Sequence, residues 1–182
     1  MRKYVSVFLL ATLCSTSCSQ KPVELTDTDV LASNDFENTD GWLAESPGLA
    51  TLNRDQAHSG KYSTMAAPGN DYSLGYSNIL SKLSSDWPGA LTVSAWVLVP
   101  NDQAAAKLVT EVKSGATNSV GLLWEGLDLA KVVKSYNKWQ YVEQTITLPE
   151  AAKPTSRLLV YLWRADSKQP VYLDDLKISR AR

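Results

Sequence analysis

Hydrophobic and polar residues alternate with a period of two over much of the chain. The segment 157–164 shows this most clearly, with one set formed by Leu158, Val160 and Leu162 and the other by Leu159, Tyr161 and Trp163. This period is typical of a β-strand that places one face on a core. We expect the first set to face the core, which leaves the aromatic set on the outer face. A register slip of one residue would reverse this assignment.

Short segments of this kind follow one another along the chain, separated by turns rich in Gly, Pro and Asn. We expect strands over 31–36, 50–53, 62–67, 72–80, 91–99, 106–113, 119–125, 139–148, 157–164 and 171–178. The segment 128–134 could form a helical turn or a loop. Many short strands with turn signals between them predict an all-β fold, a two-sheet antiparallel β-sandwich of the jelly-roll type.

Alternate strands of a jelly roll fall into two sheets. One sheet would hold the strands that begin at Tyr62, Leu91, Trp139 and Val171, and the other those that begin at Tyr72, Ala106, Ser119 and Arg157. In the first sheet the same parity places Trp96 on the outer face, beside Trp139 and Tyr141.

The N-terminus is typical of a bacterial secretory leader, because two basic residues precede an apolar run over 5–13. Ser17 before Cys18 resembles the lipobox of bacterial lipoproteins, although Ser15 stands where a leucine is usual. We expect a signal peptide over 1–17, lipidation of Cys18, a polar tether over 18–29 and one domain over 30–180. The alternative is plain secretion with cleavage near Ser17 or Ser19. The lipobox resemblance implies a lipid-anchored protein of the cell envelope, at the outer membrane, that faces the periplasm or the cell surface.

Composition argues against several classes of function. The net charge is −1 and the basic residues are scattered singly, so we expect no nucleic-acid partner. A single histidine, with both cysteines in the leader region, gives little support to a nucleophilic triad or a zinc site. No strand shows the same-face carboxylates of a glycosidase, although Glu111 and Glu125 could approach each other across neighbouring strands. We therefore expect no enzyme, with a glycan-degrading activity as a less favoured alternative.

Aromatic residues with a polar edge are abundant: six tryptophans and eight tyrosines stand beside two phenylalanines. Such rings suit surfaces that are half in water, and they match sugars, which present apolar C–H faces with a rim of hydroxyls. The expected stacking rings are Trp163, Tyr161 and Trp124, with Tyr76 and Arg164 as polar partners.

Short motifs occur in a characteristic order: NDFEN at 34–38, GW at 41–42, HSGKYS at 58–63, LTVSAWVLVP at 91–100, KWQYVEQTITLP at 138–149 and VYLDDLKI at 171–178. This succession resembles the CenC-like carbohydrate-binding modules, galactose-binding-like jelly rolls found in xylanases and glucanases. The resemblance implies binding of polysaccharide or oligosaccharide along an outer sheet face or at loop tips. Laminin-G or concanavalin-type sandwiches are a second resemblance, carried by LTVSAWVLVP and KWQYV.

The CenC-like resemblance also implies a structural calcium ion. Its ligands would be the side chains of Glu37 and Asp174, together with backbone carbonyls near Asp35 and Lys61. Calcium takes six to eight oxygen ligands of these kinds. The alternative is that Glu37 and Asp174 are ordinary acids at strand ends.

Two classes of function are therefore expected to compete. The first is non-catalytic carbohydrate binding by a lipid-anchored envelope protein. The second is an envelope scaffold or protein-interaction module that uses the same aromatic face.

Overall fold

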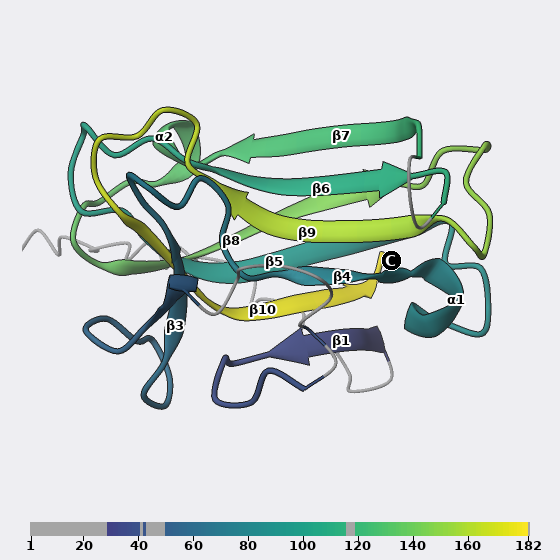
Figure 1. Cartoon of the computed structure of the whole chain (residues 1–182), viewed down its shortest axis with the longest axis horizontal. Coiled ribbons are helices and arrows are strands. Elements are labelled where there is room, and N and C mark those ends of the chain that lie inside the picture. Colours follow the sequence, from purple (N-terminus) through teal and green to yellow (C-terminus); the bar gives the residue numbers. More distant parts are fainter. Residues whose placement is uncertain (1–28, 41, 43–49, 116–118, 182) are drawn as a thin grey trace, which may run out of the picture.

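The structure, a computed structural model, describes residues 29–40, 42, 50–115 and 119–181. Within these residues two antiparallel sheets form a sandwich (Figure 1). The first sheet contains β1 (Val30–Asn34), β2 (Leu52–Asn53), β3 (Ser63–Ala66), β5 (Ala90–Leu98), β8 (Trp139–Thr147) and β10 (Val171–Arg180). The second contains β4 (Tyr76–Ile79), β6 (Lys107–Lys113), β7 (Gly121–Asp128) and β9 (Arg157–Trp163). The predicted leader, Cys18 and residues 18–28 of the predicted tether lie outside the described residues.

The strand order is β2-β3-β10-β5-β8 in the first sheet, where β1 also pairs with β10, and β4-β9-β6-β7 in the second. The predicted all-β jelly-roll sandwich is confirmed, and so is the division of the strands between the sheets. Several predicted strand bounds were wrong. Residues 35–36 lie outside β1, and β7 runs over Gly121–Asp128 instead of 119–125. Residues 50–51 lie outside β2, and the predicted strand over 72–80 is reduced to β4, followed by a helical turn, α1 (Leu80–Leu83). For 128–134, where a helical turn and a loop were both open, the structure has a helical turn, α2 (Leu129–Val132).

The predicted parity of the strands is also confirmed. Leu158, Val160 and Leu162 are 0% exposed, whereas the alternate residues of β9 are partly exposed on the outer face. In β5, Leu91, Val93, Ala95 and Val97 face the core in the same way. Each such Leu or Val side chain contributes about 1.5–3 kcal/mol when it is fully buried. A one-residue slip of β9 would expose three of them, so burial fixes the register.

A bulge interrupts β10 at Asp175. The pairing of β10 with β5 shifts register between Asp174 and Lys177, and Asp175 adopts a left-handed φ of 49°. Aspartate tolerates this conformation better than most residues. Both Asp174 and Asp175 therefore contact the loop before β3, although strict alternation would put them on opposite faces.

No helix in the described part of the chain is both long enough and apolar enough to cross a membrane.

Gly75, just before β4, allows that segment to approach β9 closely. A Cβ atom at this position would lie 2.0 Å from the carbonyl oxygen of Val160 and 3.0 Å from the Cα of Tyr161. Both neighbours are backbone atoms of β9, so they cannot move aside without moving the strand.

We expect Gly75→Ala to lower the free energy of unfolding by about 1–3 kcal/mol or more, as overpacking does in well-packed interiors. Urea denaturation of the two proteins measures this difference. Gly121→Ala is the matched control, because a Cβ at Gly121 in β7 would meet nothing within 4 Å. Equal losses in the two variants would contradict the close approach of β4 and β9.

Candidate functional site

A groove of about 520 Å³ lies over the outer face of the second sheet and the segment before β4. We call it the aromatic groove. Its lining includes aromatic rings and polar side chains that could contact a ligand: Tyr72, Ser77, Glu111, Lys113, Trp124 and Tyr161. They come from β4, β6, β7, β9 and the segment before β4, so the groove depends on the pairing of the whole sheet.

Four rings form a row along this face, and we call it the aromatic row: Tyr72, Tyr161, Trp124 and Trp163. Tyr72 meets Tyr161 edge to face, with ring centroids 5.5 Å apart. Trp124 meets Trp163 in the same manner, at 5.9 Å. Edge-to-face contacts are a favourable arrangement of aromatic pairs. The rings therefore hold one another in place, while Tyr72 and Trp124 remain 59% and 47% exposed.

Gly126 lets the indole of Trp124 lie down over β7. A Cβ at Gly126 would come within 2.9 Å of the Cη2 atom of that indole. Val109 pairs with both Gly126 and Tyr161 on the outer face, yet it is 0% exposed. The rings thus cover an apolar floor instead of projecting freely into water.

Polar groups lie directly beside the rings. The hydroxyl of Tyr161 donates to Oε2 of Glu111 at 3.2 Å, and the Nζ of Lys113 lies 3.4 Å from Oε1 of the same carboxylate. Burial, and next the charge of Glu111, raises the pKa of Tyr161 to about 12. The phenol therefore keeps its proton at neutral pH. The groove offers a fixed hydroxyl, a carboxylate and an ammonium beside its apolar rings.

Four of the five predicted binding residues lie in or directly beside the aromatic groove. Trp124 and Tyr161 line the aromatic groove, and Trp163 stands beside Trp124 at the end of the row. Tyr76 pairs with the inward-facing Val160, is 7% exposed, and still contributes to the groove wall. Burial raises the pKa of Tyr76 to about 12.

Arg164 lies outside the aromatic groove. It follows the end of β9, where its Nε lies 2.6 Å from Oδ1 of Asp71 and its Nη1 donates to the carbonyl of Ser167. Its guanidinium is thus used to tie two loops together.

Sequence reasoning missed Tyr72, Glu111 and Lys113 as groove residues. For Glu111 and Lys113 a signal existed, because they alternate in β6 with the buried Thr110 and Val112 and must therefore face outward. Tyr72 lies before β4 in an irregular segment, where no alternation indicates its direction.

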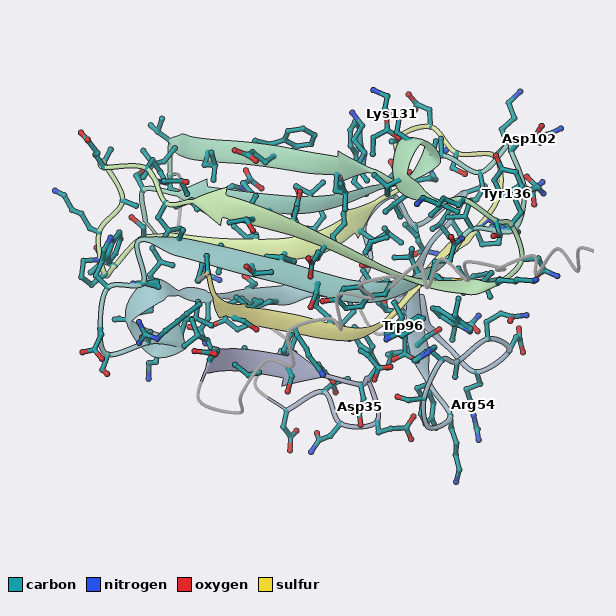
Figure 2. All side chains as sticks on the ribbon, turned by 180° about the vertical axis from the view of Figure 1, so that it is seen from behind. Asp35, Arg54, Trp96, Asp102, Lys131 and Tyr136 are labelled. Atoms are coloured by element: carbon teal, nitrogen blue, oxygen red, sulfur yellow. The ribbon has the colours of Figure 1, made fainter. Side chains whose placement is uncertain are left out.

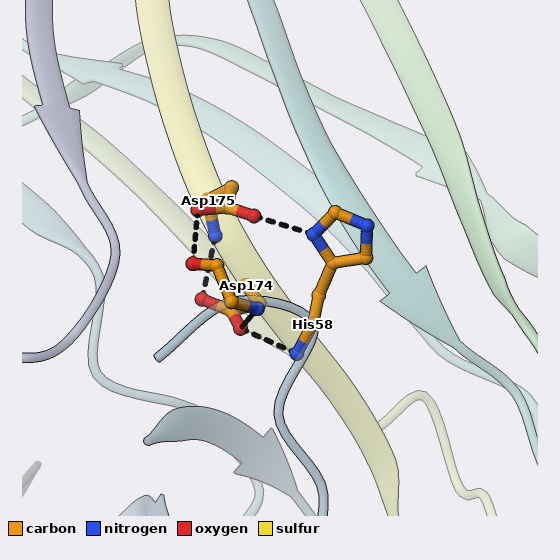
Figure 3. A network of polar contacts seen from close by, with 4 residues as sticks. His58, Asp174 and Asp175 are labelled. Atoms are coloured by element: carbon orange, nitrogen blue, oxygen red, sulfur yellow. Dashed lines mark hydrogen bonds and ion pairs between the residues drawn. The ribbon is translucent and has the colours of Figure 1, made fainter. Parts of the chain in front are cut away.

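A second cluster lies on the first sheet, around the loop formed by residues 58–62. Oε1 of Glu37 accepts the backbone N–H groups of Lys61, at 2.5 Å, and Tyr62, at 2.7 Å. Oδ2 of Asp174 accepts those of His58, at 2.7 Å, and Ser59, at 3.1 Å (Figure 3). Two carboxylates thus hold one loop from its two ends.

Asp174 is 0% exposed beneath this loop. Burial raises the pKa of its carboxyl group, and the backbone N–H groups of Ser59, His58 and Asp175 oppose that rise. The loop therefore supplies the hydrogen bonds that a buried carboxylate needs.

The side chain of His58 fixes the same loop to the sheet. Its Nδ1 lies 2.6 Å from Oδ2 of Asp175 (Figure 3). Its ring stacks on Trp96 with centroids 3.9 Å apart and an interplanar angle of 13°. As predicted, Trp96 lies on the outer side of the first sheet, where its ring is near that of Tyr141. Figure 2 labels Trp96. There the loop covers one face of its indole.

Three of the residues predicted to bind calcium, Glu37, Lys61 and Asp174, lie at this loop, and Asp35 accepts the backbone N–H of Glu37 through Oδ1 at 3.2 Å. Glu37 and Asp174 provide carboxylates, and the backbone N–H of Lys61 donates a hydrogen bond to Glu37. Within the described residues no group of three or more His, Cys, Asp or Glu side chains is placed to hold a metal ion. The two carboxylates suit calcium only if carbonyl oxygens, such as those near Asp35 and Lys61, complete its shell. The calcium site stays a prediction.

No protein-family model matches the chain, and no curated protein matches it. Solved structures are similar in fold. The CBM22-1 xylan-binding domain of Paenibacillus barcinonensis Xyn10C is 23% identical, with a TM-score of 0.54, and the match covers 85% of this chain and 97% of that one. The C-terminal family 22 carbohydrate-binding module of Clostridium thermocellum Xyn10B is 14% identical, with a TM-score of 0.54 and coverage of 87% and 97%. A further xylan-binding domain from CBM 22 is 15% identical, with a TM-score of 0.55 and coverage of 86% and 97%. At these identities the similarity establishes the sandwich fold.

Proposed function

We propose that this chain is a non-catalytic polysaccharide-binding module and that a β-linked chain such as xylan lies in the aromatic groove. The observation that carries this proposal is the aromatic row, whose rings are partly exposed in a groove and are held in place by one another. Solved structures of the same fold that are described as xylan-binding support the choice of ligand.

The groove suits a sugar chain for physical reasons. Sugar rings can stack their C–H faces on Tyr72 and Trp124, while their hydroxyls reach Tyr161, Glu111 and Lys113 at the rim. The edge-to-face contacts fix the rings before a ligand arrives. Less conformational entropy is therefore lost on binding than with freely rotating side chains.

The carboxylates of the second sheet do not favour hydrolysis. Glycosidases need two carboxylates across one cleft. Glu111 faces the groove, but Glu125 pairs with the inward-facing Thr110 and so lies on the other side of β7. Among the groove-lining residues that the structure describes, Glu111 is the only acid. This arrangement supports binding in preference to cleavage.

Trp124→Ala should weaken binding to soluble xylan about five- to thirtyfold, because removing an aromatic anchor costs about 1–2 kcal/mol. Affinity electrophoresis in gels that contain xylan or other soluble glycans measures the effect. Trp87→Ala is the matched control, since Trp87 is also 47% exposed but lies in the loop before β5. If no glycan retards the wild-type protein, the aromatic groove would instead favour a protein partner.

We also propose that calcium stabilises the 58–62 loop. Chelation should then lower the melting temperature, by roughly 2–4 °C for each kcal/mol of binding free energy. The Glu37→Gln variant should respond much less to the same chelator, because it lacks one of the carboxylates. The calcium proposal would be contradicted if the chelator left the melting temperature of the wild-type protein unchanged while Glu37→Gln melted at a lower temperature than the wild-type protein. The loop would then be held by its hydrogen bonds alone.

We further propose that Cys18 is lipidated and that the domain is held at the cell envelope, at the outer membrane, by this anchor. The leader and Ser17 before Cys18 support this proposal. When the full chain is expressed in a Gram-negative host, the protein should take up labelled palmitate and fractionate with membranes. Cys18→Ser should abolish the label, whereas Cys14→Ser should keep it. Equal labelling of the two variants would contradict the assignment.

A further inference from the structure

Lys107 lies at the end of the aromatic row where the two indoles meet. Its Nζ stands 5.7 Å from the ring centroid of Trp124 and 5.7 Å from that of Trp163. Lys107 begins β6, and its direct neighbours across the sheet are Asp128 in β7 and Trp163 in β9. The ammonium group therefore borders the surface on which a sugar would stack.

Asp128, the acid opposite Lys107, is engaged by other groups. Its Oδ1 accepts the backbone N–H of Ala130 at 3.2 Å, which caps α2. Its Oδ2 lies 3.4 Å from the Nζ of Lys131. Within the described part of the chain, Lys107 forms no ion pair of its own.

Most of the other charges on this face have partners. Glu111 is shared by Lys113 and the hydroxyl of Tyr161. Arg164, next to Trp163, is paired with Asp71 at 2.6 Å. Arg157, at the start of β9, donates from Nη1 to Oγ of Ser77 at 2.9 Å, and within the described residues it forms no ion pair, but it lies at the other end of the strand from Trp163. Beside Trp124 and Trp163, the charge of Lys107 is thus left without a carboxylate among the described residues. A neutral polysaccharide could offer this ammonium group only hydroxyl oxygens, whereas an acidic one could also offer an opposite charge.

We propose that the polysaccharide bound at the aromatic row carries carboxylate groups, as uronic-acid substituents do, and that Lys107 receives them. This inference rests on the proposed function of the groove. A sugar stacked on Trp124 or Trp163 brings its substituents to the edge of the indoles. A carboxylate placed there accepts a charge-assisted hydrogen bond from the ammonium group.

The expected gain in affinity is modest. Ion pairs that remain open to solvent contribute about 0.2–1 kcal/mol, which corresponds to a preference of up to about fivefold for the acidic ligand. Salt screens such pairs, because the Debye length falls from about 10 Å at 0.1 M to about 3 Å at 1 M. The preference should therefore disappear at high salt, whereas stacking should persist.

A matched pair of ligands tests this inference. The probes are a xylan with glucuronic acid side groups and the same xylan after chemical reduction of its carboxyl groups to alcohols. For each variant, calorimetry gives the ratio of the two affinities. The wild-type ratio should be about two- to fivefold in favour of the acidic form. Lys107→Met, which keeps the aliphatic stem over the indoles, should bring this ratio to about one, and Lys107→Arg should retain it.

Lys138→Met is the control, because Lys138 is an exposed lysine just before β8 in the other sheet. Its ratio should match that of the wild-type protein. Equal wild-type affinity for the two xylans, or a preference that persists in Lys107→Met, would overturn the role of Lys107 and leave the proposed function intact. Failure to bind any soluble glycan of the wider panel would overturn the proposed function itself.

Discussion

Burial of one face of β9 is the constraint on which the candidate site depends. Leu158, Val160 and Leu162 are removed completely from solvent, so Tyr161 and Trp163 must lie on the opposite side of the strand. β9 pairs with both β4 and β6, and the same register sets the outward residues of β6. The free energy that stabilises the core therefore also determines which rings lie on the outer face.

The two outer faces of the sandwich show that an outward position is not enough to make a binding surface. Trp96 and Trp124 both face away from the core, but the 58–62 loop places the ring of His58 flat on Trp96. The buried Asp174 needs the backbone N–H groups of that loop, so the loop stays against the first sheet. Among the residues that the structure describes, no ring from a loop stacks on Trp124 in this way, and Trp124 keeps 47% of its surface exposed. The requirement to satisfy a buried carboxylate on one sheet thus leaves the other sheet as the better surface for stacking.

Alternation predicted the fold and the outward position of Tyr161 and Trp163, because a long regular strand carries them. In β7 it left open whether Trp124, or Leu123 and Glu125, face outward, and the pairing of Trp124 with Glu111 decides for Trp124. Alternation failed where the chain is irregular. Tyr76 faces the core side of a strand much shorter than expected, after a segment whose path is set by the close approach of Gly75 to Val160. Arg164 lies just beyond the end of β9, where a nearby carboxylate, Asp71, decides its direction. The bulge at Asp175 turns two successive aspartates toward one loop, and no hydrophobic pattern marks such a bulge. Long-range contacts of this kind leave no local signal in the sequence.

Charge shows the same limit of sequence-based inference. A net charge of −1 with scattered basic residues indicates no particular partner. What matters at the aromatic row is how each charge is neutralised by its neighbours. Lys113 and Arg164 are neutralised by Glu111 and Asp71, whereas Asp128 is drawn toward Lys131 and the first turn of α2. The helical turn after β7 therefore has an effect beyond its own stability, because by engaging Asp128 it leaves the ammonium group of Lys107 available beside the indoles. Selectivity for an acidic or a neutral glycan would then depend on a capping interaction outside the groove.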